Sequence, residues 1–242
     1  MGRCGLPPGI RACLFDLDGV LTRTASVHRR AWAETFDPIL AEAGQLPFTE
    51  DDYLRHVDGK PRRDGVRDFL ASRGMHLPEG DANDPVEMST VAGIGNRKNE
   101  LLLRVLADAG VEVFAGSLTY LHAARAAGLA VGVVTASANG EAVLRAAGLA
   151  DLVDVRIDGV VASREHLRGK PAPDTFLAGA RALGVEPIQA AVFEDALAGV
   201  AAGRAGGFGW VVGVDRADHA DDLRSHGADV VVTDLAQLLE DQ

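Results

Sequence analysis

The chain has 242 residues, of which 47% are hydrophobic, so it can bury a sizeable core in one large domain or two smaller ones. Its 24 Lys and Arg residues are outnumbered by 35 Asp and Glu residues, which gives a formal net charge of −11. This balance excludes the general attraction to nucleic acid that a basic patch provides. Any phosphorylated substrate would therefore have to be held by local positive groups or by a metal.

The sequence contains no apolar run near the roughly 20 residues that span a bilayer. Its start, Met1 to Pro8, lacks the apolar core of a signal peptide. Cys4 and Cys13 are the only cysteines, and Cys13 lies in the first predicted strand, so a disulfide framework is not expected. These features predict a cytoplasmic protein that binds neither nucleic acid nor membrane.

The first predicted strand, from Ile10 to Phe15, ends at Asp16-Leu17-Asp18-Gly19. Residues i and i+2 of a strand point the same way, but the strand ends here, so Asp16 can face a pocket while Asp18 lies on the following turn. Gly19 allows the backbone to bend sharply. Two such close acids repel unless a cation, a shared proton or a chemical task offsets the cost. The alternative is a solvated, Asp-rich turn.

The next segment, from about residue 25 to 108, has few strand-like runs. Helical patterns occupy Val27 to Ala43, Asp64 to Ser72 and Lys98 to Ala109, with a loop over Met75 to Glu87. Because this segment is inserted between the first and second strands, it predicts a helical cap domain over the active-site edge. The alternative is that its helices pack on the sheet as ordinary crossovers.

Two later apolar runs repeat the pattern of the first. Leu129 to Val134 ends at Thr135, and Ala190 to Phe193 ends at Glu194-Asp195. Further strands are predicted at Trp210 to Val214 and Asp229 to Val232. Helices are predicted at Gly116 to Ala127, Gly140 to Ala147, Pro173 to Leu183 and Ala196 to Ala205, followed by possible C-cap glycines at 128, 148, 184 and 206. The alternation predicts an α/β fold with a doubly wound parallel sheet, whose ligands bind beyond the carboxyl ends of the strands.

The residues expected at that edge suit phosphoryl transfer, which needs a nucleophile, charge neutralisation and a proton shuttle. Asp16 could attack phosphorus and form an aspartyl phosphate, while Asp18 serves as general acid and base. Glu194 and Asp195, together with Asp16, offer the hard oxygen ligands that Mg²⁺ prefers.

Two other side chains could bind phosphoryl oxygens. Thr135 offers a hydroxyl and nearby backbone N–H groups. Lys170 lies in the stiff sequence Gly169-Lys170-Pro171-Ala172-Pro173 and can neutralise phosphoryl charge. The alternative for Lys170 alone is a solvated surface lysine.

As a set, these residues resemble the four motifs of the haloacid dehalogenase-like superfamily, in the same order and at the same strand ends. The resemblance spans nearly the whole chain and is greatest to the β-phosphoglucomutase branch. Further matching sequences are Thr22-Arg23-Thr24-Ala25 with His28 and Ala31-Trp32, Asp58-Gly59-Lys60-Pro61-Arg62, Arg97-Lys98-Asn99, Thr135-Ala136-Ser137-Ala138-Asn139 and Lys170-Pro171-Ala172-Pro173-Asp174. The resemblance implies a Rossmann-like core, residues 1–24 and 111–242, with an inserted α-helical cap, residues 25–110.

The resemblance also implies roles for the core residues. Asp16 matches the nucleophile and Asp18 the acid/base. Thr135 and Lys170 match residues that contact the transferring phosphoryl group. The implied Mg²⁺ site consists of Asp16, Asp18, Glu194 and Asp195.

Substrate-binding roles are implied for a second group. His28 matches a cap histidine that couples substrate binding to cap closure, and Arg62 matches an arginine that holds the distal phosphate. Ser137 and Asn139 match residues of the same phosphate site. Trp32 and Lys98 are expected to contact the substrate from the cap, although a solvated helix start is an equal alternative for Lys98 and Asn99. For His28 alone, the alternative is a surface or packing residue.

The chain departs from the mutase pattern at three positions. Ala138 replaces a lysine near the distal phosphate, Arg23 replaces an aspartate, and Ala196 replaces a serine. Lys60, Arg62 or Arg63 could compensate for Ala138. The glycines at 199, 203, 206, 207 and 209 are interpreted as serving a helix end and a turn, and Gly93-Ile94-Gly95 lacks the third glycine of a dinucleotide motif.

The leading hypothesis is a Mg²⁺-dependent phosphomutase that interconverts β-D-glucose 1-phosphate and glucose 6-phosphate and acts as a monomer. A phosphatase acting on a small sugar phosphate would share every core residue and differ in letting water reach the phospho-aspartate. A catalytically silent binding protein on the same fold is a third hypothesis, against which the intact set of core residues argues.

Overall fold

The computed structural model describes residues 3–240, and the chain divides into two compact units. The core unit joins Met1–Arg23 to Val111–Gln242, and the helical unit comprises Thr24–Gly110. The extreme residues of the predicted core domain, 1–2 and 241–242, lie outside the described residues. Within the described part of the chain, no helix is long and apolar enough to cross a membrane.

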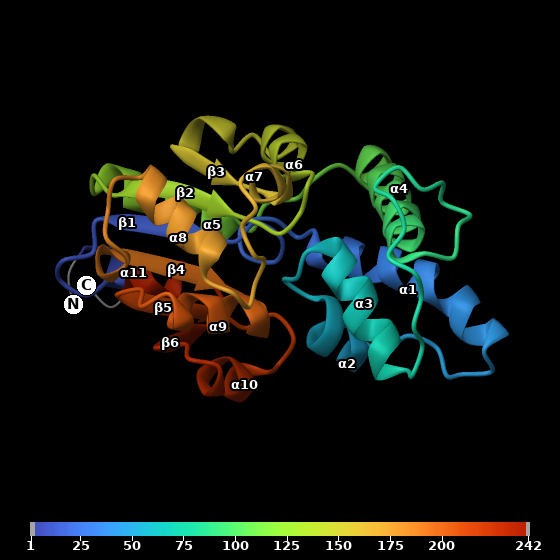
Figure 1. Cartoon of the computed structure of the whole chain (residues 1–242). Coiled ribbons are helices and arrows are strands. Elements are labelled where there is room, and N and C mark those ends of the chain that lie inside the picture. The colour runs from blue at the N-terminus through green and yellow to red at the C-terminus, as the bar shows by residue number, and fades with distance from the viewer. Residues whose placement is uncertain (1–2, 241–242) are drawn as a thin grey trace. The chain divides into compact units, whose positions relative to one another are not determined.

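The core unit is built on one parallel sheet of six strands (Figure 1). The strands are β1 (Ala12–Phe15), β2 (Ala130–Val134), β3 (Val155–Ile157), β4 (Ala190–Glu194), β5 (Trp210–Val214) and β6 (Val230–Val232). Their spatial order is β3-β2-β1-β4-β5-β6, and every neighbouring pair is parallel. The central strand β1 pairs with β2 on one side and β4 on the other, so three predicted strands meet at the middle of the sheet.

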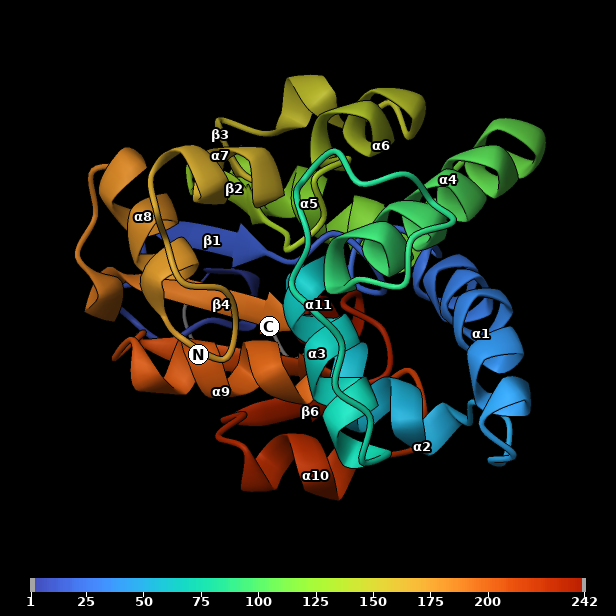
Figure 2. The same cartoon turned by 45° about the vertical axis from the view of Figure 1, so that its right-hand side comes forward.

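Helices pack on both faces of this sheet, which confirms the predicted doubly wound, Rossmann-like α/β fold. The helices of the core unit are α5 (Ala115–Ala126), α6 (Gly140–Ala146), α7 (Gly159–Arg164), α8 (Asp174–Ala182), α9 (Leu197–Ala205), α10 (Ala220–Ser225) and α11 (Gln237–Glu240). Short helical turns occur at Arg3–Gly5, Ala150–Leu152 and Pro187–Gln189. Figure 2 shows α8 and α9 over β1 and β4 on the same side of the sheet.

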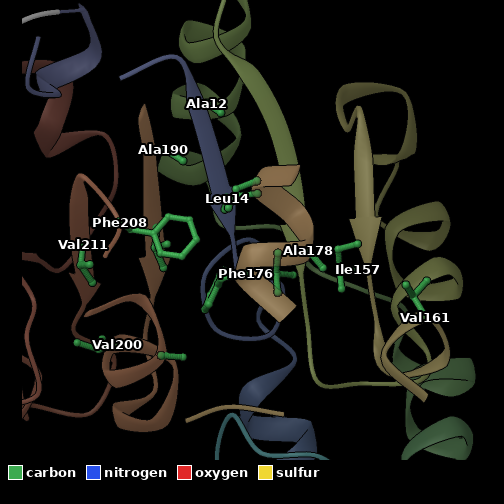
Figure 3. Packing of buried hydrophobic residues seen from close by; sticks show 14 of the residues in the cluster. Ala12, Leu14, Ile157, Val161, Phe176, Ala178, Ala190, Val200, Phe208 and Val211 are labelled. Carbon is green, nitrogen blue, oxygen red and sulfur yellow. The ribbon is translucent and has the colours of Figure 1, made fainter. Parts of the chain in front are cut away.

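The alternation of side chains along β1 determines which residues meet each layer of helices. Leu14 lies in the hydrophobic cluster under α8 and α9, where Figure 3 shows it with Phe176. A side chain added at Gly179 of α8 would lie 3.0 Å from Leu14 Cδ2, so this glycine lets the helix pack closely on the strand. On the opposite face, the Phe15 ring lies 4.4 Å from that of Phe193 and 6.2 Å from that of Tyr120 in α5, centroid to centroid.

The helical unit has a hydrophobic core of its own. Its helices are α1 (Ala25–Glu42), α2 (Glu50–Asp52), α3 (Arg62–Ser72) and α4 (Val91–Ala109), with a wider helical turn at Tyr53–Val57. The ring centroids of Phe36 and Trp32 in α1 are 5.1 Å apart, and that of Phe36 lies 4.3 Å from that of Phe69 in α3. The cap role of this unit stays a prediction.

Three local differences separate the structure from the sequence predictions. Helix α4 begins at Val91 rather than Lys98, because Thr90 caps its N-terminus by accepting a hydrogen bond from Gly93 N. Strand β3 and helix α7 were not predicted, since a three-residue strand and a six-residue helix carry little periodic signal. After α9 the left-handed glycine is Gly207 rather than Gly206.

Candidate active site

Asp16 is positioned by the parallel ladder at the carboxyl end of β1. Its backbone N–H donates to Phe193 O at 2.9 Å, which continues the pairing with β4 by one residue. The register aligns Phe15 with Val133 and Phe193, so Asp16 lies beside Val134 and Glu194. Asp16 is 5% exposed, which excludes the solvated turn that the sequence left open.

Lys170 joins the ends of β1, β2 and β4. Its ammonium donates to Asp16 Oδ1 at 2.5 Å, to Glu194 Oε1 at 2.5 Å and to Val134 O at 3.0 Å. These three acceptors match the three N–H donors of a lysine. The residue is 3% exposed, and its Nζ lies 4.8 Å from the centroid of the Phe176 ring. Lys170 is therefore part of a buried charge network and not a solvated surface lysine.

The network holds more negative charge than Lys170 neutralises. Burial raises the pKa of Asp16 above its ordinary value and raises the pKa of Glu194 to about 8, although the ammonium of Lys170 acts in the opposite direction. Burial alone would lower the pKa of Lys170, but the charges of Asp16 and Glu194 outweigh it and hold this pKa above the ordinary lysine value. Another cation would favour the ionised acids.

Asp195 completes a set of three carboxylates that could hold that cation. One oxygen each from Asp16, Glu194 and Asp195 lie within 4.8 Å of one another, and all three residues are buried. When all are ionised, three negative charges face the single positive charge of Lys170. An all-oxygen, carboxylate-rich set with excess negative charge fits Mg²⁺, for which oxygen ligands are preferred.

Two glycines make room for these acids. A side chain at Gly19, where φ is +92°, would lie 1.8 Å from Asp195 Oδ2, and one at Gly199 would lie 1.8 Å from Glu194 Oε1. The other Glu194 oxygen accepts a hydrogen bond from Ala196 N at 3.1 Å. The sequence pattern assigns Gly199 to a helix end or a turn. In the structure, Gly199 lies in the first turn of α9 and contacts the Glu194 side chain. A glycine five residues after a motif acid is too weak a signal to reveal this.

Among the described residues, Asp18 is not one of the three grouped carboxylates, although its charge adds to the effect of burial in raising the pKa of nearby Asp16. Thr135 Oγ1 donates to Asp18 Oδ2 at 3.3 Å and accepts from Ser137 N at 3.0 Å. Ser137 Oγ in turn accepts from Asn139 N at 3.2 Å. The structure thus brings the predicted acid/base to the loop after β2, next to the predicted phosphoryl-binding hydroxyl. The metal-binding role of Asp18 stays a prediction.

Three of the predicted substrate-binding residues meet inside the helical unit. Lys98 Nζ lies 3.0 Å from His28 Nδ1 and 5.1 Å from the centroid of the Trp32 ring. Because an ammonium can only donate, Nδ1 accepts, which makes the imidazole neutral. Burial, followed by the charge of Lys98, holds the pKa of His28 well below its usual value. Lys98 is 4% exposed, which excludes the solvated helix start.

Arg62 is the first residue of α3 and belongs to the same helical unit as His28 and Lys98. A side chain at Gly95 of α4 would lie 3.4 Å from Arg62 Cγ, so α4 packs against the Arg62 stem. Burial and the neighbouring Arg63 lower the pKa of Arg62. Within residues 3–240, no carboxylate forms an ion pair with Arg62, whereas Lys60 Nζ is 2.5 Å from Asp68 Oδ2. Arg62 therefore suits an external anion better than Lys60 does.

The parallel sheet and its buried acid–lysine edge define an α/β protein with a site suited to a divalent cation. A family model described as haloacid dehalogenase-like hydrolase matches residues 10–207. The chain belongs to the haloacid dehalogenase-like hydrolase family.

Relatives extend this finding to the predicted branch. The chain is 56% identical over 245 residues to a β-phosphoglucomutase of Mycobacterium bovis, covering 97% of this chain and 94% of that one. It is 30% identical to a validoxylamine A 7′-phosphate phosphatase of Streptomyces hygroscopicus subsp. limoneus, covering 94% and 95%. The structure of a β-phosphoglucomutase from Clostridium difficile matches with a TM-score of 0.76 and 25% identity over 95% of this chain and 93% of that one.

These likenesses confirm the predicted membership of the superfamily and of its β-phosphoglucomutase-like branch. They also confirm the prediction that the chain is an enzyme of this superfamily.

Proposed function

We propose that the chain is a Mg²⁺-dependent phosphomutase that interconverts β-D-glucose 1-phosphate and glucose 6-phosphate through a phosphorylated Asp16. The single observation that carries this proposal is the buried network in which Lys170 contacts Asp16 and Glu194 beside Asp195. The 56% identity to a protein named β-phosphoglucomutase supports the choice of substrate.

In the proposed reaction, an Asp16 carboxylate oxygen attacks a phosphorus atom of a bisphosphorylated sugar. A P–O bond to Asp16 forms, the P–O bond to the sugar breaks, and Asp18 gives its proton to the departing sugar oxygen. In the return half-reaction, the 6-hydroxyl oxygen of β-glucose 1-phosphate attacks the phosphorus of phospho-Asp16. A P–O bond to the sugar forms, the P–O bond to Asp16 breaks, and Asp18 takes the hydroxyl proton, which regenerates the bisphosphorylated sugar and the Asp16 carboxylate.

Charge neutralisation is divided among the other core residues. Lys170 and Thr135 contact the transferring phosphoryl group, and Asp16, Asp18, Glu194 and Asp195 hold the metal. Bound Mg²⁺ supplies positive charge that offsets the repulsion between carboxylate and phosphate.

The rest of the substrate is assigned to residues of both units. In the helical unit, Arg62 binds the distal phosphate through its guanidinium fork. In the core unit, Ser137 and Asn139 are assigned to phosphate binding. His28, Trp32 and Lys98 couple sugar binding to the exclusion of water by the cap, since water would hydrolyse the phospho-aspartate. A cytoplasmic location, a monomeric state and the absence of nucleic-acid binding remain predictions.

A phosphatase is the second candidate. The 30% identity to a protein named validoxylamine A 7′-phosphate phosphatase favours it, as does Ala138, which leaves one positive group fewer for a distal phosphate. Phosphorus NMR separates the two candidates, with Mg²⁺, β-glucose 1-phosphate and a trace of the 1,6-bisphosphate. We expect the signal to move to glucose 6-phosphate with little inorganic phosphate. Accumulating inorganic phosphate would establish the phosphatase, and an Asp16→Asn protein with the wild-type rate would contradict both candidates.

A further inference from the structure

A loop with no assigned role lies beside the candidate active site. This loop, Asp215–His219, connects β5 to α10 and is called the β5–α10 loop below. Asp215 Oδ1 accepts hydrogen bonds from Ala217 N at 3.2 Å and His219 N at 3.0 Å. The loop is therefore braced by its own first residue, and its other side chains can reach outward from a fixed backbone.

Arg216 reaches from this loop to the turn that follows Asp16. Its Nε donates to Gly19 O at 2.8 Å, and its Nη1 donates to Thr233 O at 2.7 Å. Its guanidinium carbon lies 3.6 Å from the centroid of the buried Phe114 ring. Two hydrogen bonds and one stacking contact fix the plane of a guanidinium, so the Gly19 carbonyl is held by a rigid donor.

His219 reaches from the same loop to the turn that follows β4. Its Nε2 lies 3.2 Å from Asp195 O, and because a carbonyl only accepts, Nε2 is the donor. On the other side of the ring, Nδ1 lies 3.4 Å from Asp215 Oδ1. The His219 side chain is 8% exposed, so the ring is packed between the loop and the Asp195 turn.

The two turns held in this way are in direct contact with each other. A side chain at Gly19 would overlap Asp195 Oδ2, at 1.8 Å. Because Asp195 belongs to the three-carboxylate set, a small separation of the two turns would move one of its oxygens. The β5–α10 loop donates to both backbone carbonyls, one on each side of this contact.

We propose that the β5–α10 loop positions the metal-binding turns, with Arg216 acting through Gly19 and His219 acting through Asp195. This inference rests on the proposed function, since it assigns the two side chains to the cation site of that reaction. They are positioning residues, because neither touches the reacting atoms. Groups that orient metal ligands from outside typically change metal affinity or activity by about 10- to 100-fold when they are removed.

Arg216→Met is a sharp test because loss of the charge and loss of the positioning contact change the cation affinity in opposite directions. The Arg216 charge interacts with that of Asp195, so its removal alone would strengthen the binding of a cation. Loss of the positioning contact would weaken it. We expect the dissociation constant of Mn²⁺, measured by electron paramagnetic resonance on the full chain without substrate, to rise about tenfold in Arg216→Met and in His219→Leu.

Conservative variants and matched controls separate positioning from folding. His219→Gln retains a donor near the Nε2 position and should recover most of the affinity, while Arg216→Lys retains the charge but not the fork and should recover part of it. Arg224→Met and His226→Leu make the same kinds of change on and just after α10, at exposed side chains that contact neither turn. Thermal melting and circular dichroism of each variant establish that it is folded at the assay temperature.

The kinetic signature is a fall in kcat at limiting Mg²⁺ that saturating Mg²⁺ restores, with an unchanged KM for the sugar phosphate. Wild-type Mn²⁺ affinity in folded Arg216→Met and His219→Leu, or tighter binding in Arg216→Met, would overturn the positioning role and leave the proposed function intact. A wild-type chain that binds no Mn²⁺ would overturn the proposed function and the inference together.

Discussion

Each unit buries a lysine, and the two lysines have different surroundings. Lys170 in the core is 3% exposed and contacts two carboxylates, whereas Lys98 in the helical unit is 4% exposed and contacts a neutral imidazole and an indole ring. The core thus holds its positive charge in a fixed ionic network. The helical unit places its positive charge against an imidazole that burial keeps neutral. Burial of the same residue type thus produces two electrostatic environments, an ionic network in one unit and a contact with a neutral imidazole in the other.

Replacing each lysine by methionine tests this comparison, and the largest expected effect is on kcat. Lys170→Met leaves Asp16 and Glu194 without their buried partner, so we expect kcat to fall on the order of 10²- to 10³-fold. The free energy of unfolding should fall by roughly 3 kcal/mol. Lys98→Met should reduce kcat/KM only about tenfold, as expected for one lost charged hydrogen bond. Steady-state kinetics and urea unfolding of both variants measure these effects, and equal losses in the two would refute the comparison.

The distal phosphate gives a second contrast, within the helical unit. Arg62 has no carboxylate partner among the described residues, while Lys60 is paired with Asp68. We expect Arg62→Met to raise the KM for the sugar phosphate roughly thirtyfold or more. Lys60→Met, the matched loss of one positive charge, should change KM by less than about threefold, because the Lys60 charge is already paired with Asp68, whose side chain is 55% exposed, and such ion pairs contribute little. A larger effect at Lys60 would reassign the phosphate site.

Two glycines of α9 provide a test of whether Glu194 binds the cation. Gly199→Ala places a methyl group 1.8 Å from Glu194 Oε1, so Glu194 must move and Mn²⁺ binding should weaken about tenfold. Gly203→Ala is the control, since its methyl group would meet Val192 Cγ1 and Val211 Cγ2 at 3.2 Å. Calorimetric titration with Mn²⁺ compares the two, and similar affinities would show that Glu194 does not bind the cation.

The smallest expected effect is a pH dependence of the free energy of unfolding that arises from His28 in the helical unit. The pKa of folded His28 lies below its ordinary value of 6.5, so below that pH the unfolded chain takes up a proton that folded His28 does not. The free energy of unfolding therefore falls as the pH drops from 6.5 toward the folded-state pKa, with a contribution of at most about 1.4 kcal/mol per pH unit. His28→Gln should remove this contribution, and the same substitution at exposed His226 provides the control. Parallel stability curves for wild type and His28→Gln would contradict the buried neutral imidazole.

The sequence predicts the core strands well because buried parallel strands are continuous apolar runs. Asp16, Thr135, Glu194 and Asp195 follow directly after such runs, so the amino-acid pattern alone is enough to place them at a shared edge. Lys170 stands out by its motif, but its contacts with Asp16 and Glu194 depend on long-range packing that no local pattern encodes.

Other features of the site cannot be predicted from local sequence patterns. Arg216 and His219 contact backbone carbonyls of segments far from them in the sequence. Gly199 lies only five residues after Glu194, but nothing in the sequence marks it as a contact of that acid. The start of α4 was missed because Gly93 and Gly95 weaken the helical pattern that the Thr90 cap restores. Pattern reasoning therefore locates acids at strand ends more readily than the residues that hold those strand ends together.

The most direct test of the central proposal is to locate the transferred phosphoryl group on the protein. The purified chain would be mixed with Mg²⁺ and glucose 1,6-bisphosphate, quenched in acid within one turnover and digested for peptide mass spectrometry. We predict one added phosphoryl group on Asp16 in the wild-type protein and none in Asp16→Asn. A phosphoryl group on any other residue, or an unmodified Asp16 in a protein that turns over substrate, would contradict the proposed mechanism.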